Sequence, residues 1–422
     1  MLQKIKHPLI GNFISSVVLQ CVNYALPLLT VPYLFRVLSV EKYGLVNFAN
    51  AFIQYFIVFT DFGYTLSATK LVAENRDDDL KLSQVFNRVM FSKLLLLTIG
   101  FAVISFIIFS LPKFSSDKFL YIYAYGMVIG NVLFPVWFFM GMEKMKFITI
   151  ITIITRTLAL IPIFMLVKSS NDYLLVPAIN SVGSILSGTI GIVIVSRIFK
   201  IKYTVPSFGE IMHSLKDSSQ YFLSRVSVSV YTISNVFTLG LFGTNIMVGY
   251  YSAAEKLFIA IQNAYVPVNN SLYPYMTKTK NTVIFKKIFW FITIANTVLL
   301  AGLFIYAKEI LYLIYKIQDE ESLLVFKLLL IACLLIIPSI LLGYPFLGAM
   351  GYSRFTNKSV ISSSIFHLLG LIILVLTNTL SIYTVAGMLI ITEGVVCGIR
   401  LWGAYKFKLF KVPDKNIEQA IS

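Results

Sequence analysis

Charged side chains are scarce in this sequence. Asp, Glu, Lys and Arg make up 13% of the 422 residues, against about 25% in an average soluble domain. Hydrophobic residues make up 58%, and the mean hydropathy is +0.82. This composition excludes a soluble globular domain and indicates a protein that crosses a membrane many times.

Cysteine and histidine are also rare, with 3 residues of each. Cys21, Cys333 and Cys397 lie far apart in apolar runs, and the histidines are equally scattered. Neither residue type has the spacing of a disulfide framework or of a metal site. We therefore expect no metal and no cofactor.

Long polar segments are lacking too. The largest ones, near residues 68–85, 197–217 and 307–323, hold about twenty residues or fewer, and longer unstructured connections are uncommon. A separate catalytic domain has no room in such a chain. We therefore expect no enzyme.

What the chain has in abundance is apolar runs close to the ~20 residues that a helix needs to span a bilayer. The predicted spans are residues 9–34, 44–66, 86–111, 119–140, 147–167, 174–196, 218–241, 247–276, 284–307, 324–349, 358–378 and 383–405. The first run is too long for a cleavable signal peptide and lacks a small-residue cleavage site. The predicted fold class is an all-α polytopic membrane protein with twelve transmembrane helices.

The net charge of +16 would suggest a nucleic-acid partner in a soluble protein. When the 35 Lys and Arg residues are assigned to the two sides of the predicted spans, 23 fall on one side and 7 on the other, and the remaining 5 lie in spans or near their ends. The positive-inside rule makes the richer side cytoplasmic. We therefore expect both termini in the cytoplasm and no nucleic-acid binding.

The eighth predicted span, residues 247–276, is apolar overall but carries a polar face. At 100° per residue, its strongly polar groups fall within an arc of about 120°. They include Ser252, Glu255, Lys256, Asn263 and Asn270. This face cannot contact lipid, because an ionised group at membrane depth costs at least a few kcal/mol. We predict that it lines a hydrated path, and a buried Glu255–Lys256 pair that holds helices together is the simpler alternative.

The first, second and seventh spans carry similar polar faces. With the eighth span they are expected to line a central cleft through Asn23, Asn47, Asn50, Gln54, Ser227, Tyr231 and Asn235. Ser and Thr are common in ordinary helix packing, whereas amides in register are harder to explain in that way. Spans three to six and nine to twelve are more uniformly apolar, and we expect them to form outer walls.

Several ionisable residues lie inside or near the ends of spans. Asp61, Lys93, Arg156 and Arg225 join Glu255 as interior charges. Each is a candidate for anion contact, for ion coupling or for a structural salt bridge, and the sequence leaves these roles open. Lys256 lies on the polar face itself and is the best candidate for contact with an anionic substrate.

The chain repeats itself once. Gly44 and Gly249 open corresponding spans 205 residues apart, and the Met140-Gly141 pair recurs 210 residues later. We therefore predict two six-helix lobes around the cleft, residues 1–205 and residues 206–422. Because six is even, both copies enter from the same side, and an axis along the membrane normal should relate them.

Two smaller patterns make further structural predictions. Gly126 and Gly130 have the spacing of a close contact between transmembrane helices. Trp137, Trp290 and Trp402 are expected at the membrane interfaces, where aromatic side chains act as anchors.

Three segments resemble motifs of the O-antigen flippases of the Wzx type. They are Asp61–Lys70 (DFGYTLSATK), Trp137–Met145 (WFFMGMEKM) and Gly249–Leu257 (GYYSAAEKL). The similarity extends over the whole chain in length, helix count and loop pattern. The chain thus looks like a polysaccharide transporter of the multidrug/oligosaccharidyl-lipid/polysaccharide (MOP) exporter superfamily.

This resemblance implies a flippase in the inner membrane of a bacterium. Its cargo would be undecaprenyl-diphosphate-linked O-antigen or a similar oligosaccharide, moved by alternating access from the cytoplasmic to the periplasmic leaflet. Membrane lipid and other polysaccharide-assembly proteins are the further partners implied, and coupling to H⁺ or Na⁺ stays open. The alternative on the same scaffold is a cation-coupled drug exporter, which a more acidic interior would favour. A membrane sugar–lipid polymerase, which needs a substantial outer segment, is the weakest alternative.

We predict that reporter fusions after Lys42 and after Lys316 read periplasmic, and that fusions after Lys81 and after Lys411 read cytoplasmic. The reason is the charge bias between the two sides of the membrane. An inverted pattern of reporter activity would contradict this topology.

Overall fold

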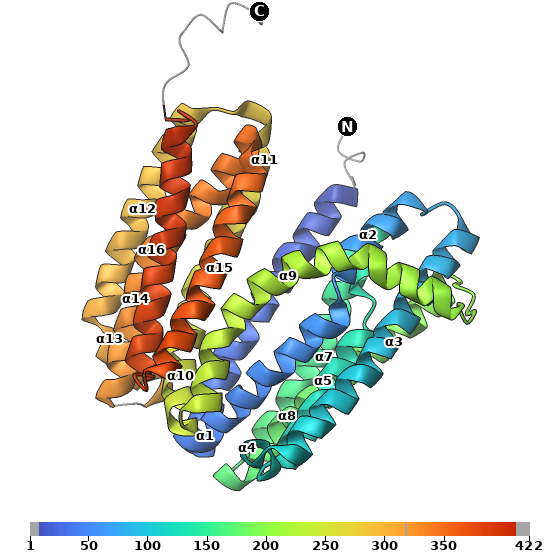
Figure 1. Cartoon of the computed structure of the whole chain (residues 1–422), viewed down its shortest axis with the longest axis horizontal. Coiled ribbons are helices and arrows are strands. Elements are labelled where there is room, and N and C mark those ends of the chain that lie inside the picture. The colour runs from blue at the N-terminus through green and yellow to red at the C-terminus, as the bar shows by residue number, and fades with distance from the viewer. Residues whose placement is uncertain (1–7, 317–318, 411–422) are drawn as a thin grey trace, which may run out of the picture. The chain divides into compact units, whose positions relative to one another are not determined.

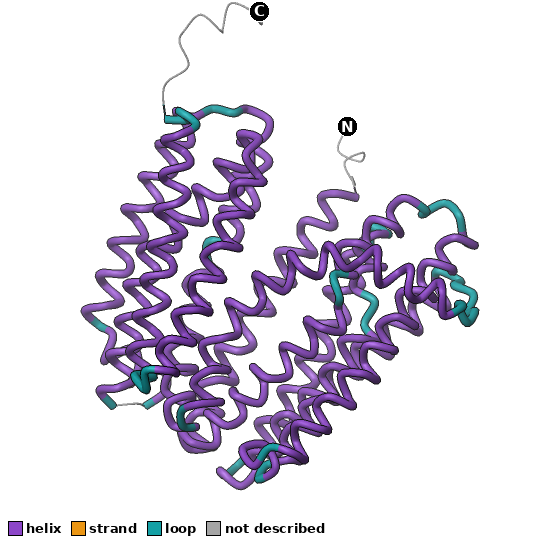
Figure 2. The backbone as a smooth tube through the Cα atoms, viewed as in Figure 1, coloured by secondary structure: helices purple, strands orange, loops and turns teal. Residues whose placement is uncertain are grey.

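The computed structural model describes residues 8–316 and 319–410, and all regular structure in these ranges is helical (Figure 2). Some side chains within the helices fall outside the described part. The chain divides into two compact units, Met1–Gly249 and Tyr250–Ser422.

The first unit holds one very long helix, a set of membrane-length helices and several short ones (Figure 1). The elements are α1 (Pro8–Asp61), α2 (Tyr64–Glu74), α3 (Asp79–Ser110), α4 (Pro112–Ser115), α5 (Lys118–Leu133), α6 (Val136–Gly141), α7 (Met145–Leu166), the 3₁₀ helix η1 (Ser170–Leu174), α8 (Leu175–Ile198), α9 (Phe208–Phe242) and the start of α10 (Asn245–Asn263). Helix α8 packs along both α5 and α7. Helix α1 combines the first two predicted spans across a kink at Ser39, whose φ of 66° and ψ of 158° are not helical.

The second unit contains the rest of α10 and the helices that follow it. These are α11 (Val266–Thr279), α12 (Thr282–Ile305), α13 (Ala307–Tyr315), α14 (Glu320–Leu341), the π-helix η2 (Leu342–Tyr352), α15 (Ser353–Leu376) and α16 (Ile382–Lys406). The predicted span 247–276 is interrupted between α10 and α11, directly before Pro267. Proline has no backbone N–H to continue the helical ladder, which accounts for the position of this break.

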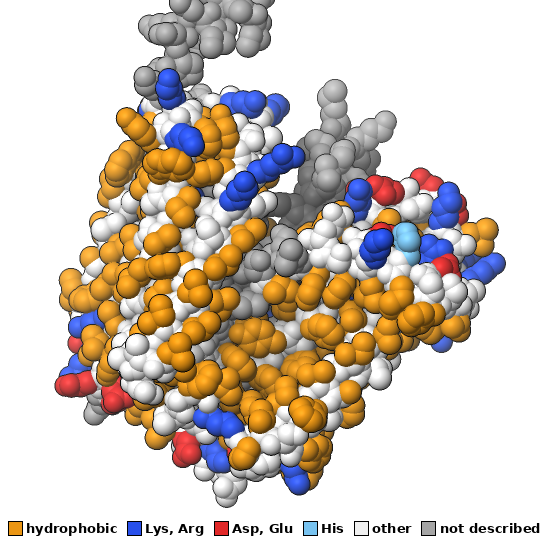
Figure 3. Space-filling view, viewed as in Figure 1, with side chains coloured by type: hydrophobic (Ala, Val, Ile, Leu, Met, Phe, Trp, Pro, Cys, Tyr) orange, Lys and Arg blue, Asp and Glu red, His pale blue; other side chains and the backbone are white. Residues whose placement is uncertain are grey.

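The outer surfaces of the helices are apolar. Eight helical segments of the described chain are long and apolar enough to cross a membrane. Large side chains such as Phe106 and Phe291 are 72% and 73% exposed, and Figure 3 shows hydrophobic side chains along the flanks with charged ones toward the ends. This is a multi-pass membrane protein. The count of twelve spans and the lobe boundary after residue 205 stay predictions.

The two units share a local arrangement that agrees with the internal repeat. In the first unit, α2 packs on α6, with Val72 against Gly141. In the second unit, α11 packs on η2, and Met276 shares a buried cluster with Phe346. The paired segments are the ones related by the offsets of 205 and 210 residues.

The repeat-related glycines Gly44 and Gly249 touch each other. A Cβ at Gly44 would lie 1.8 Å from the Asn245 carbonyl oxygen and 2.7 Å from the Gly249 nitrogen. A Cβ at Gly249 would lie 2.3 Å from the Val40 carbonyl oxygen. Helix α1 therefore crosses the start of α10 backbone to backbone, at a distance that only glycine permits.

The predicted close contact at Gly126 and Gly130 is confirmed. A Cβ at Gly126 would lie 2.6 Å from the Ser181 Cβ, and one at Gly130 would lie 2.3 Å from the Ser184 carbonyl carbon. These small residues let α5 and α8 approach along their backbones, where dispersion contacts are densest.

The prediction for Trp137 is wrong. Its side chain is only 1% exposed, and its ring lies 5.6 Å from that of Phe86 in a buried cluster. The cause is the short helix α6, which is covered by α2 and so does not reach an outer surface. Trp290 and Trp402 are 60% and 54% exposed, as an interfacial anchor requires.

The start of α9, ahead of the seventh predicted span, is tied to the start of α3. Glu210 closes a capping box with Ser207, and Arg88 Nε donates a hydrogen bond of 3.0 Å to Glu210 Oε1. The Ser207 backbone N–H and then Arg88 hold the pKa of Glu210 below its usual value. This link therefore contributes stability at neutral pH and loses it as the pH falls through the lowered pKa.

We predict that Gly44→Ala lowers the thermal midpoint of the purified protein in detergent. The added methyl group has no space, and overpacking of this kind costs about 1–3 kcal/mol. The matched control is Gly302→Ala, because nothing lies within 4 Å of a Cβ there. That control should match or exceed the wild-type midpoint, since alanine favours a helix by up to ~1 kcal/mol. Equal midpoints for the two variants would refute the contact.

Candidate functional site

Two of the segments that carry the resemblance meet at one end of the first unit. Thr69 Oγ1 of α2 donates a hydrogen bond of 3.2 Å to the Trp137 carbonyl oxygen. Arg76 Nε donates one of 2.6 Å to the Gly141 carbonyl, and its Nη1 lies 2.9 Å from a carboxylate oxygen of Glu143. The two motifs are therefore parts of one packed junction.

The helical backbone is broken between α1 and α2 by two residues with positive φ. Phe62 and Gly63 have φ values of 44° and 79°, and glycine adopts the second without strain. Gly63 packs against the backbone of Phe222 in α9, and the Phe62 ring stacks on the Phe222 ring at 4.4 Å. The break thus places the start of α2 directly on α9.

Two hydroxyl pairs continue this contact between α2 and α9. Tyr64 Oη and Ser214 Oγ are 3.0 Å apart, and Ser67 Oγ and Ser218 Oγ are 2.7 Å apart. Ser67 and Ser218 are both buried. Hydrogen bonds that are satisfied and shielded from water fix the spacing of the two helices.

Asp61 and Lys93 bring opposite charges into the interior near this junction. Their side chains are 8% and 2% exposed. Asp61 Oδ1 accepts a hydrogen bond of 2.7 Å from Thr65, whereas its Oδ2 has no partner among the described residues. Lys93 forms no ion pair at contact distance within the described chain, and Asp61 acts on it electrostatically from farther away. The structure thus buries both predicted interior charges without joining them in a direct salt bridge.

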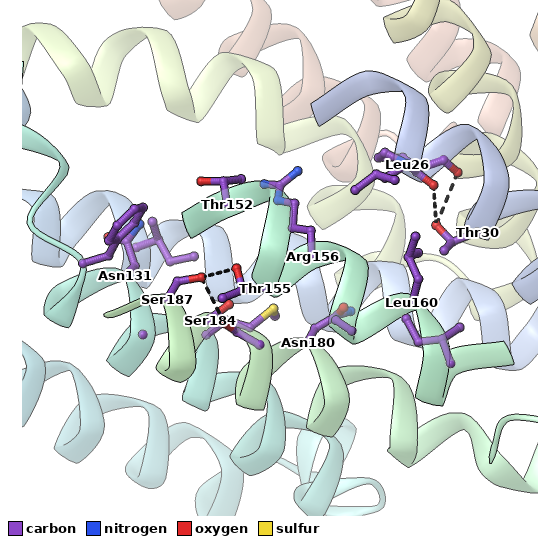
Figure 4. Close-up of a pocket in the computed structure, with 18 of the residues that line it drawn as sticks. Leu26, Thr30, Asn131, Thr152, Thr155, Arg156, Leu160, Asn180, Ser184 and Ser187 are labelled. Carbon is purple, nitrogen blue, oxygen red and sulfur yellow. Dashed lines mark hydrogen bonds between the residues drawn. The ribbon is translucent and has the colours of Figure 1, made fainter. Parts of the chain in front are cut away.

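A polar cavity of about 440 Å³ lies within the first unit (Figure 4). Helices α1, α5, α7 and α8 line it. Some of its polar groups are satisfied by the protein: Thr155 Oγ1 and Ser187 Oγ are 2.6 Å apart, and Ser187 also donates 3.1 Å to the Gly183 carbonyl. The other faces of the helices around the cavity are apolar. The cavity is therefore the part of these helices that suits a polar ligand.

Six other polar side chains of the lining form no hydrogen bond with any described side chain or backbone group. They are Gln54, Asn131, Thr152, Arg156, Asn180 and Ser184. A polar group left unsatisfied in hydrocarbon costs several kcal/mol, so these groups must be hydrated or occupied by a ligand. Figure 4 shows Arg156 extending from α7 beside Thr152.

The described lining of the cavity carries a single positive charge. Arg156 is the one charged residue of the described lining, and no Asp or Glu is part of it. The cavity therefore favours an anionic or neutral polar guest over a cation.

The predicted cleft residues of the first unit are dispersed. Gln54 lines the cavity. Asn47 instead donates 2.9 Å to the Tyr43 carbonyl of its own helix, and Asn235 is only 4% exposed. Asn50 is half-buried, with its Oδ1 lacking a described partner. Of these, Gln54 is the one that the structure brings together with Arg156.

Four further predicted residues are on α1 or α9, at positions whose side chains lie outside the described residues. They are Asn23, Arg225, Ser227 and Tyr231. Their contribution to a cleft stays a prediction.

The polar face of the eighth span belongs mostly to the second unit. Ser252 is fully buried, and its Oγ has no described partner. Glu255 and Lys256 are half-buried and form no ion pair within contact distance in the described chain. Asn263 ends α10 and is half-buried, and Asn270 on α11 is exposed. The anion-binding role of Lys256 stays a prediction.

The sequence reasoning missed most of the cavity. Asn131, Thr152, Asn180 and Ser184 lie in spans four to six, which were expected to form plain outer walls. That expectation is wrong for the inner faces of α5, α7 and α8. A single amide in an otherwise apolar span was the available signal, since such groups rarely face lipid.

The helical fold with its apolar flanks and polar cavity defines a multi-pass membrane protein. Two solved structures share this fold. "Lipid II flippase MurJ, inward closed conformation" aligns at a TM-score of 0.76 and 15% identity, over 94% of this chain and 87% of that one. An inward-facing multidrug resistance MATE family transporter of the MOP superfamily aligns at 0.66 and 14% identity, over 95% and 99%.

The sequence comparisons define the family. Residues 9–280 match the family described as polysaccharide biosynthesis protein. A protein of Escherichia coli (strain K12), named as an O-antigen transporter, is 31% identical over 283 residues, covering 65% of this chain and 68% of that protein. A protein of the same name from Shigella dysenteriae is 32% identical over 259 residues, covering 61% and 64%.

This chain therefore belongs to the polysaccharide biosynthesis protein family. The resemblance that the motifs indicated is confirmed at this level. The relatives are named as transporters and flippases, and the expectation of a protein other than an enzyme agrees with them.

We predict that Ser67→Cys and Ser218→Cys, in a background without native cysteines, form a disulfide under mild oxidation. The two hydroxyl oxygens are 2.7 Å apart, and a disulfide needs ~2.05 Å between sulfurs. The readout is loss of maleimide labelling that a reductant restores. The matched control pairs Ser67→Cys with Ser219→Cys, whose side chain points about 100° away. Equal cross-linking of both pairs would refute the α2–α9 contact.

Proposed function

We propose that this protein is a flippase for lipid-linked oligosaccharide. It moves an undecaprenyl-diphosphate-linked O-antigen or similar repeat unit from the cytoplasmic to the periplasmic leaflet of a bacterial inner membrane. The observation that carries the proposal is the polar cavity inside an apolar helical unit, in a chain of the polysaccharide biosynthesis family.

The physical task fits this arrangement. A sugar and its diphosphate cannot cross ~30 Å of hydrocarbon unaided. Each hydroxyl that loses its water needs a hydrogen-bond partner. The cavity offers amide, hydroxyl and guanidinium groups for this purpose, and the polyprenyl tail can remain in the bilayer along the apolar flanks.

The names of the relatives indicate which substrate to test first. Two related proteins are named as O-antigen transporters, and a protein of the same fold is named lipid II flippase. O-antigen linked to a lipid carrier is therefore the first cargo to test. Under this proposal transport proceeds by alternating access, with both termini in the cytoplasm.

A cation-coupled drug exporter is the rival function, because a multidrug transporter has the same fold. The described lining of the cavity opposes it. A cationic drug would meet Arg156 and no carboxylate there, and like charges repel strongly where water is scarce. Asp61 and Glu255 remain the residues to examine for coupling to H⁺ or Na⁺.

We predict that Lys256→Ala abolishes surface polysaccharide in a strain that lacks its own copy of the gene, while Lys256→Arg retains part of it. A fixed cation in a site partly shielded from water attracts a diphosphate more strongly than it would in bulk solvent. Export is measured by immunodetection of the polysaccharide, with equal amounts of each variant in the membrane as the control.

The double variant Glu255→Gln with Lys256→Gln separates anion binding from a structural pair. If Lys256 only neutralises Glu255, losing both charges is milder than losing one, because an unpaired buried charge is the costly state. Restored export in the double variant would overturn the anion role of Lys256.

A further inference from the structure

The cavity of the first unit holds a positive charge that no described residue balances. Arg156 lines the cavity with its side chain exposed, forms no ion pair or hydrogen bond with a described residue, and shares the described lining with no acid. A guanidinium cannot lose its proton as a lysine can, so it stays charged wherever the fold places it. The described part of the chain therefore holds a permanent cation among apolar helices without a counter-ion.

Such a cation is either hydrated or paired with an anion from outside the described residues. A charge inside a membrane protein is expensive, and it marks a functional site by default. Asp61 interacts with other residues of the unit. It accepts a hydrogen bond from Thr65, and its charge acts on Lys93. The geometry leaves the cavity itself as the place where an anion would meet Arg156.

The groups around Arg156 suit a phosphate that carries a sugar. Asn131 from α5, Thr152 from α7, and Asn180 and Ser184 from α8 present donors and acceptors that no described residue uses. Guanidinium pairs with phosphate through two parallel hydrogen bonds, and amides serve sugar hydroxyls as both donor and acceptor. The combination matches the linkage between a sugar and a diphosphate.

The wall that carries these groups is rigid. Gly130 of α5 meets the Ser184 backbone, and Gly188 of α8 meets the Leu133 side chain, with added Cβ atoms at 2.3 Å and 2.5 Å. Close backbone packing of α5 and α8 thus fixes the positions of Asn131 and Asn180 before a ligand arrives. A preorganised site of this kind loses less entropy on binding.

The size of the cavity limits what it holds. Its volume of about 440 Å³ lies within the range of about 300–1,000 Å³ that is typical of small-molecule sites. It suits a headgroup rather than an extended chain of sugars. The remainder of a repeat unit would have to lie beyond it.

We propose that this cavity is the subsite for the phosphate-bearing end of the substrate, with Arg156 contacting the phosphate and Asn131 and Asn180 contacting the adjoining sugar. The proposal rests on the function proposed above, because it assigns one part of a lipid-linked saccharide to one place. It adds an anion site in the first unit that is separate from Lys256.

The test uses the full-length protein in detergent and inorganic pyrophosphate as the probe. Thermal midpoints are measured against pyrophosphate concentration, with sodium chloride at matched ionic strength as the reference. Pyrophosphate should raise the wild-type midpoint. Arg156→Gln should weaken the apparent affinity by at least about tenfold, the effect of losing one strong charged contact. Arg156→Lys should retain part of the effect.

The matched control is Arg197→Gln. Arg197 is an exposed arginine of α8 that does not line the cavity, so its loss should leave the pyrophosphate effect unchanged. Asn180→Leu provides a second variant should Arg156→Gln fail to fold. It keeps the charge but removes a polar contact, and it should also weaken the effect.

Two results would overturn the proposal: a wild-type protein indifferent to pyrophosphate, or an equal response in wild type, Arg156→Gln and Asn180→Leu. Export in cells separates this failure from failure of the proposed function. If export requires the protein but pyrophosphate binding ignores Arg156, only the subsite is wrong. If export of lipid-linked saccharide proceeds without the protein, the proposed function is wrong, and the pyrophosphate result stands as binding alone.

Discussion

A polar group inside a lipid-embedded protein must find a partner in the protein or reach water, and the arrangement of this chain depends on that constraint. Many hydroxyls and amides are satisfied by the preceding turn of their own helix, as Thr60 is by the Phe56 carbonyl and Asn47 by that of Tyr43. Thr155 and Ser187 in the cavity lining are satisfied in the same way, whereas Asn131, Thr152 and Asn180 form no hydrogen bond with a described residue. Polar side chains with a partner in their own helix stabilise that helix, whereas those without a described partner are available to a ligand.

Close packing of small residues makes the cavity possible. Where Gly126 and Gly130 let α5 touch α8, the helices are held backbone to backbone. Beyond the contact, side chains such as Asn131 project into open space instead of into a neighbour. Without a hydrophobic driving force between helices in lipid, such contacts supply much of the association energy. The α5–α8 contact therefore forms one wall of the cavity, and α1 and α7 complete the lining.

The contact between α2 and α9 connects the motifs with the proposed transport cycle. Helix α9 is the first helix of the predicted C-lobe, yet Ser218 on it bonds to Ser67 on α2. Alternating access between two lobes would require contacts of this kind to form and break. Two hydroxyl pairs and one aromatic stack suit that role, because each is worth only about 0.5–1.5 kcal/mol.

The sequence alone determined the membrane class, the candidate spans, the family resemblance and the close contact at Gly126, because composition, run length and short spacings are local properties of the chain. It did not determine which helix faces become interior. Trp137 was expected at an interface and is buried, and Asn131 and Asn180 were passed over in spans that looked uniformly apolar. Only the tertiary structure decided these positions, because the side of a helix that meets lipid, protein or a cavity depends on which neighbours pack against it, and those neighbours are distant in sequence.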